Sequence, residues 1–152
     1  MGTNQEENSS DEELVFDIKQ DPYNYAMRVV FSKWKPFILR AMDLDEGNLT
    51  HFARFTKQLP ITEKVLSQNL KQLEADGLVY RTVLPTTPPQ VEYRLTEDGK
   101  SVIELLDKVY EWAWKQMKER DMPIDALGEM WHGFREKDES VMLHPFKKTY
   151  NR

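Results

Sequence analysis

Four polar side chains recur along one short stretch of this chain at the spacing of a single helix face. Lys64, Ser67, Gln68 and Lys71 stand at i, i+3, i+4 and i+7 in the segment TEKVLSQNLKQLEADG, and a helix of 3.6 residues per turn places such residues side by side. Ammonium groups bind phosphate oxygens, while hydroxyl and amide groups also bond the edges of bases. The pattern is typical of a helix that contacts nucleic acid, and a merely solvated helix face is the alternative.

The residue types that catalysis or metal binding would need are absent or scattered. The chain has no cysteine, which excludes disulfides, thiolate catalysis and cysteine-based zinc sites. His51, His132 and His144 lack partners at metal-ligand spacing, so structural or surface histidines are the favoured interpretation. We therefore predict that the chain is not an enzyme and holds no metal or cofactor.

The segment that carries the four polar residues has clear helix signals. Thr62 can cap its start after Pro60, and Gly77 supplies the left-handed residue that ends a helix. The opposite face is apolar, with Leu66, Leu70 and Leu73. These signals predict an amphipathic helix over about residues 62–76.

Two β-prone runs follow this helix, LVYRTV and QVEYRL. The loop LPTTPPQ between them projects from the sheet, because Pro88 and Pro89 have no N–H for ladder pairing. We expect a hairpin, or wing, whose outer part spans about residues 82–91. Arg81 at its base either contacts phosphate or pairs with Glu92 across the ribbon.

The elements before and after this unit are predicted to be helices. Asp21 and Pro22 begin a helix that runs to about Ser32, and a second begins near Lys35. Gly47-Asn48 breaks the pattern, and Thr50 is expected to cap a third helix. The segment from about 97 to 120 after Thr96 is long and amphipathic.

This order of elements predicts the fold class. It is mainly α with a small two-stranded antiparallel β-wing, a winged helix-turn-helix, dimerising through terminal helices. In such folds one helix enters the major groove of DNA and the wing reaches flanking DNA. The predicted phosphate contacts are Lys33, Lys35, His51, Arg54 and Arg81; the predicted groove contacts are Thr62, Lys64, Ser67, Gln68 and Lys71; the wing adds Thr86, Thr87 and Gln90.

The long helix has too broad an apolar surface for one small domain. Trp112 and Trp114 are two residues apart, so they point to different sides of the helix. We expect a homodimer interface formed by Val102, Leu105, Leu106, Val109, Tyr110, Trp112, Ala113 and Met117. A pocket for a small hydrophobic effector near that interface is the alternative for the aromatic residues.

Charge and composition mark the ends of the domain. Residues 1–21 hold seven acidic residues and one lysine, whereas Arg28–Arg81 hold nine basic and six acidic residues in a chain of net charge −5. We predict an acidic, disordered arm over 1–20, a DNA-binding domain over 21–120, and an extension over 121–152. The extension contains one short helix with Ile124, Leu127, Trp131 and Phe134. No signal peptide or membrane span is visible, which favours a cytoplasmic protein.

Three blocks in this order resemble the HxlR-type transcriptional regulators, which are related in architecture to the MarR regulators. The blocks are KWKPFIL (33–39), LSQNLKQLEADGLVYR (66–81) and PPQVEYRLTEDG (88–99), followed by Trp112. The resemblance covers roughly residues 21–114 and implies a bacterial or archaeal homodimer that binds double-stranded DNA.

Departures from the family pattern affect two of its expected features. Asp21-Pro22 stands where many members have Cys-Pro, so thiol sensing is not available to this chain. Gln90 stands where an arginine often follows the wing prolines. The order of elements and the resemblance together predict a homodimeric regulator that binds a pseudo-palindromic operator. The alternative is a winged-helix module that binds protein and has no operator.

Overall fold

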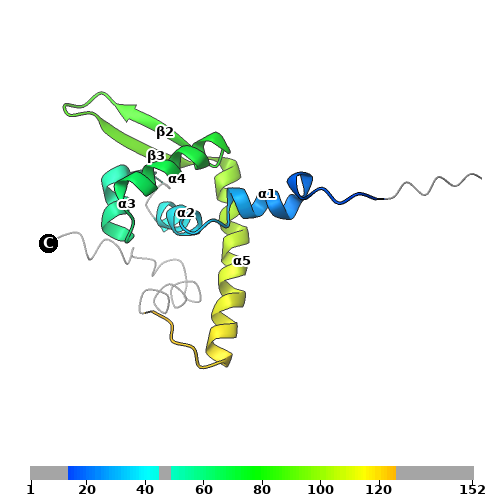
Figure 1. Cartoon of the computed structure of the whole chain (residues 1–152). Coiled ribbons are helices and arrows are strands. Elements are labelled where there is room, and N and C mark those ends of the chain that lie inside the picture. Colours follow the sequence, from blue (N-terminus) through cyan, green and yellow to red (C-terminus); the bar gives the residue numbers. More distant parts are fainter. Residues whose placement is uncertain (1–13, 45–48, 126–152) are drawn as a thin grey trace, which may run out of the picture.

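Five α-helices and a small antiparallel sheet make up the protein in the computed structural model, which describes residues 14–44 and 49–125 (Figure 1). The elements in order are a 3-10 turn (Ile18–Gln20), α1 (Pro22–Val29), α2 (Lys35–Leu44), β1 (Leu49–His51), α3 (Phe52–Gln58), α4 (Glu63–Ala75), β2 (Val79–Leu84), β3 (Gln90–Leu95) and α5 (Glu97–Glu119). None of the described helices is long and apolar enough to cross a membrane.

Most predicted elements are confirmed. Asp21 caps α1 through Oδ1, which accepts bonds from the backbone N–H groups of Tyr23 and Asn24. The helix ends at Val29, three residues before the predicted end. Residues 1–13 of the predicted arm over 1–20 lie outside the described residues, and Ile18–Gln20 near its end form the 3-10 turn. The break at Gly47-Asn48 and the part of the C-terminal extension after residue 125 also lie outside the described residues.

The predicted two-stranded wing is confirmed, and it projects from the helical body with α4 near its base (Figure 1). A third strand, β1, pairs with the other edge of β3, giving the order β1-β3-β2. Thr50 lies within β1, so its predicted role as a helix cap is wrong. The helix cap is His51, which makes no side-chain capping bond.

The strand register also overturns the predicted pair between Arg81 and Glu92. Arg81 lies opposite Tyr93, whereas Glu92 lies opposite Thr82 on one side and His51 on the other. Because successive side chains of a strand point to opposite faces, Arg81 and Glu92 cannot meet. This leaves Arg81 on the sheet face that it shares with Tyr93.

The core lies where α2, α3 and α4 meet the base of the sheet. Leu66, Leu70 and Leu73 are fully buried, as the periodicity of α4 predicted. Phe55 of α3 is also fully buried and meets the ring of Tyr93 edge-on, with centroids 6.4 Å apart. Burying one face of α4 in this way turns its polar face outward.

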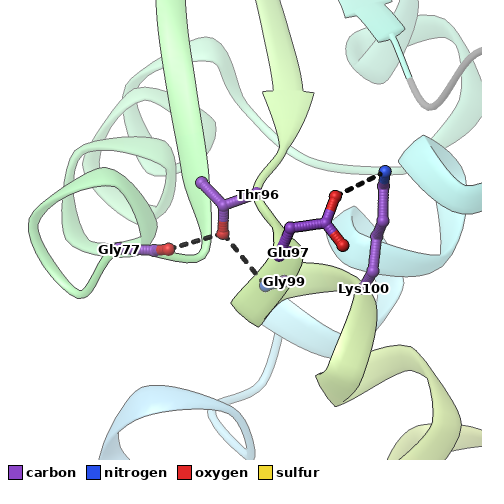
Figure 2. Close-up of polar contacts among 5 residues, drawn as sticks. All are labelled: Gly77, Thr96, Glu97, Gly99 and Lys100. Atoms are coloured by element: carbon purple, nitrogen blue, oxygen red, sulfur yellow. Dashed lines mark hydrogen bonds and ion pairs between the residues drawn. The ribbon is translucent and has the colours of Figure 1, made fainter.

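A compact joint links the end of α4 to the start of α5 (Figure 2). Gly77 has φ +77°, a conformation that glycine adopts without strain, and its carbonyl accepts a bond of 2.6 Å from Thr96 Oγ1. Thr96 Oγ1 also accepts a bond of 3.0 Å from the N–H of Gly99 and so caps α5. One hydroxyl thus fixes two helices relative to each other.

Gly99→Ala is expected to destabilise this joint. Gly99 is buried, and an added Cβ would collide with the carbonyl oxygen of Leu78, which already accepts a bond from the N–H of Thr96. Overpacking of this kind typically costs about 1–3 kcal/mol. Urea denaturation should show a lower free energy of unfolding. The exposed neighbour Lys100→Ala is the control, and equal stability of the two variants would contradict the prediction.

Candidate nucleic-acid interface

The predicted recognition helix is α4, and its outer face is open. Thr62 caps it through Oγ1, which accepts the N–H of Val65 at 3.3 Å. Lys64, Gln68 and Lys71 are exposed, and Ser67 is half-buried at the border of the face. The helix therefore presents the four polar side chains as one accessible strip.

A groove of about 860 Å³ runs between α4, the start of α3 and the wing. Five of the thirteen predicted contact residues line it: His51, Ser67, Lys71, Arg81 and Gln90. These residues come from four elements that lie up to 39 positions apart along the chain. The groove gathers cations and hydrogen-bonding groups on one concave surface.

Glu74 also lines the groove and is not among the predicted contact residues. It lies one position beyond Leu73 on α4, three residues after Lys71. A carboxylate in this position would repel the phosphate oxygens of DNA. It would instead accept a hydrogen bond from a donor group on the edge of a base. Glu74 follows Lys71 by three residues, a spacing that places both side chains on one face of a helix. This spacing could have identified Glu74 from the sequence.

At the base of the wing, His51 lies beside Glu92. The distance between His51 Nε2 and Glu92 Oε1 is 3.7 Å, and the Glu92 side chain is 15% exposed. The two side chains form an ion pair when the imidazole is protonated. Glu92 therefore places a carboxylate beside the His51 ring at the edge of the groove.

At the tip of the wing, Thr86 has a structural role. Its Oγ1 donates to the carbonyl of Pro88 at 2.8 Å and accepts the N–H of Gln90 at 3.0 Å. These bonds shape the loop that carries the exposed Thr87. Thr86 thus holds the tip in place for whatever the wing contacts.

The remaining predicted contacts lie outside the groove lining. Lys33 is exposed, with Nζ 5.2 Å from the ring centroid of Trp34. Arg54 is half-buried on α3. Lys64, Gln68, Thr62 and Thr87 are exposed beyond the groove's walls.

Lys35 does not fit its predicted role as a phosphate contact. Its side chain is buried, with 2% of the residue exposed, and Nζ donates to the carbonyl of Arg28 at 2.9 Å. Arg28 in turn forms a 3.3 Å ion pair with Asp76 at the end of α4. Lys35 therefore joins α1 and α2 inside the protein, and we remove it from the contact set.

Burial lowers the pKa of the Lys35 ammonium below its usual value, Asp76 opposes this effect, and Arg28 adds to it. The pKa of Lys35 is higher in the unfolded chain than in the folded protein. At pH values between the folded-state pKa and about 10.4, the unfolded state therefore carries more of the Lys35 proton than the folded state does. The contribution of Lys35 to the free energy of unfolding therefore rises as the pH rises through that range.

Lys35→Met should remove this pH dependence. The wild-type protein is expected to gain stability relative to Lys35→Met as the pH rises from neutrality toward 10, because the charge burial that opposes folding is relieved. Urea denaturation of both proteins across this range measures the difference. Lys33→Met, which changes an exposed lysine, is the matched control. A difference that stays flat or falls with pH would contradict the prediction.

The eight predicted interface residues of α5 divide into an exposed group and a half-buried group, and the half-buried group includes Tyr110, Ala113 and Met117. Leu105, Val109 and Trp112 are 44%, 41% and 66% exposed, whereas Val102 and Leu106 pack against the core of their own domain. Trp114 is half-buried on another side of the helix from Trp112, as their spacing predicted. The exposed group is an apolar strip without cover among the described residues.

The family model described as HxlR-like helix-turn-helix matches residues 29–121. The chain is 41% identical over 101 residues to an HTH-type transcriptional regulator from Methanothermobacter thermautotrophicus, covering 63% of this chain and 75% of that one. A similar regulator from Halalkalibacterium halodurans is 37% identical, with coverages of 66% and 88%.

Solved structures of transcriptional regulators are also similar to this chain. The redox regulator HypR in its reduced form superposes with a TM-score of 0.60 at 31% identity, covering 66% of this chain and 98% of that one. The HTH-type transcriptional regulator ytcD superposes with a TM-score of 0.59 at 32% identity, with coverages of 64% and 98%.

Proposed function

This chain belongs to the HxlR-like helix-turn-helix family, a family of transcriptional regulators with a DNA-binding fold, and we propose that it acts as a homodimer on a pseudo-palindromic operator. Helix α4 enters the major groove, and the wing lies on flanking DNA. Two recognition helices related by a two-fold axis would then meet half-sites about one helical turn, roughly 34 Å, apart.

The groove between α4 and the wing is the observation that carries this proposal. It brings Lys71 of α4 and Arg81 of β2 to one concave surface together with Ser67 and Gln90. Lysine and arginine in this lining suit phosphates, and the neutral Ser67 and Gln90 suit sugar or base edges. Lys64 and Gln68 extend this surface along the exposed face of α4.

The proposed dimer interface is the exposed apolar strip of α5, formed by Leu105, Val109 and Trp112. Burying such a strip against its own copy removes apolar surface from water, and a two-fold axis makes the same patch serve both partners. Size-exclusion chromatography with light scattering should give twice the chain mass of 18.0 kDa. The chain would act in the cytoplasm, where its DNA is.

Sequencing host DNA fragments retained by the purified protein tests the proposal. The expected result is one enriched motif with two inverted half-sites separated by about one helical turn. An enriched motif without inverted symmetry would contradict the dimeric operator. Retention without any enriched sequence would contradict sequence-specific binding and favour the protein-binding module.

The predicted hydrophobic effector belongs to the same proposal. Its place would be the apolar surface where α5 faces α2, because Tyr110, Ala113 and Met117 line a groove there. Such a ligand would act by changing the angle between the interface helix and the DNA-binding body.

A further inference from the structure

A second groove lies between α2, the end of α3 and the C-terminal half of α5. It encloses about 560 Å³, and its walls are largely apolar, with Phe37, Leu106, Trp114 and Met117 among them. The guanidinium of Arg40 lies 4.2 Å from the ring centroid of Tyr110 at its side. An apolar hollow of this size in water favours an occupant that removes its surface from solvent.

One polar side chain in this groove needs a partner. Gln58 at the end of α3 lines the groove, and both its amide atoms are buried without a hydrogen bond in the part of the chain that the structure describes. A buried amide without partners is unfavourable. A peptide backbone offers one donor and one acceptor per residue, which is the pair that Gln58 requires.

The chain itself turns into this groove. After α5 ends, the N–H of Met122 bonds to the carbonyl of Met117 at 2.9 Å and the N–H of Asp121 bonds to Lys118, with Asp121 at φ +51°. This left-handed turn reverses the chain direction. Pro123, Ile124 and Asp125, the last described residues, then line the groove.

We propose that residues 126–152 of the same chain occupy this groove. Leu127, Trp131 and Phe134 continue the spacing that begins at Ile124, which gives one apolar stripe at helical period. The tether at Asp125 keeps this segment at a high effective concentration beside the groove, an advantage that no free ligand has. The family match ends at residue 121, so the proposed occupant lies beyond the part of the chain that the family model covers, whereas most of the groove lies within it.

Self-docking has a consequence for regulation. The segment holds α2 and α5 together, since both helices form walls of the groove. A small hydrophobic effector would then have to displace the segment in order to bind. Self-docking requires no DNA binding, so the segment would occupy the groove whether or not the protein recognises an operator.

Disulfide scanning tests the proposal directly, because the chain contains no cysteine. In the full-length protein, Phe37→Cys or Leu59→Cys in the groove, both outside the proposed dimer interface, is combined with Leu127→Cys, Trp131→Cys or Phe134→Cys. A disulfide requires Cα atoms within about 7 Å, so oxidation in dilute solution reports proximity. Thr82→Cys on the exposed surface of β2, combined with the same partners, is the control.

At least one groove pair is expected to form a disulfide within one chain, and none of the Thr82 pairs is expected to do so. Intact mass and non-reducing gels detect the disulfide. Covalent dimers from the groove pairs would assign the occupant to a second copy and overturn the proposal. No bond at any groove pair, or equal bonding with Thr82, would also overturn it.

A second measurement does not depend on engineered bonds. Trp131→Ser with Phe134→Ser should undock the segment, raise the fluorescence of 8-anilinonaphthalene-1-sulfonate through the exposed groove, and lower Tm. Glu129→Ser with His132→Ser changes polar positions of the same segment and should behave as wild type. Identical dye binding and Tm for both double variants would overturn the proposal.

Discussion

Lys71→Ala combined with Arg81→Ala is expected to weaken DNA binding strongly and to flatten its dependence on salt. The two cations line the groove between α4 and the wing, one from α4 and one from β2, and each would neutralise a phosphate there. Each lost phosphate contact reduces the slope of log K against log salt by about 0.9, so a dimer that loses four contacts should lose about 3.6. Fluorescence anisotropy titrations at several salt concentrations measure this slope.

The matched control for this double variant is Lys100→Ala combined with Lys115→Ala, because it also removes two cations and both lysines are exposed on α5, where they pair with Glu97 and Glu119. Its slope should equal that of the wild-type protein. If the double variant kept the wild-type slope, the groove would not be a phosphate-binding surface. Equal flattening by both changes would show a general effect of net charge instead.

Phe55→Ala is expected to cost about 3–5 kcal/mol of folding free energy, because it leaves a cavity in the core. Phe55 is fully buried between α3 and the sheet and packs edge-on against Tyr93. A loss of this size removes a large fraction of the stability of an ordinary domain. Thermal and urea unfolding at one fixed protein concentration measure it, since dimerisation makes Tm depend on concentration.

Phe16→Ala removes the same side chain from an exposed position and is the control. Phe16 is 75% exposed, and surface substitutions usually change stability by no more than about 0.5 kcal/mol. If the two variants had equal stability, Phe55 would not be the packing centre between α3 and the wing. Loss of DNA binding by Phe55→Ala at temperatures where it stays folded would show that this packing also sets the angle of the wing.

The sequence by itself determined the elements whose signals are local. The leucine period of α4, the cap at Thr62, the stop at Gly77, the proline loop of the wing and the start of the long helix after Thr96 were all predicted correctly. Each signal depends on residues within a few positions of one another, and the physics of helix periodicity, capping and left-handed glycine acts at that range. The outward orientation of the polar face of α4 also followed from the sequence, because the opposite face of the helix is apolar.

The tertiary structure alone decided which residues share a surface. Lysine is usually a surface residue, yet Lys35 is buried and its ammonium donates to the carbonyl of Arg28 at the end of α1. The register of β2 against β3 sets Arg81 beside Tyr93 instead of Glu92. Strand β1 is only three residues long and exists through its pairing with β3. These outcomes depend on contacts between segments far apart in the chain, and no local pattern of residue types encodes such contacts.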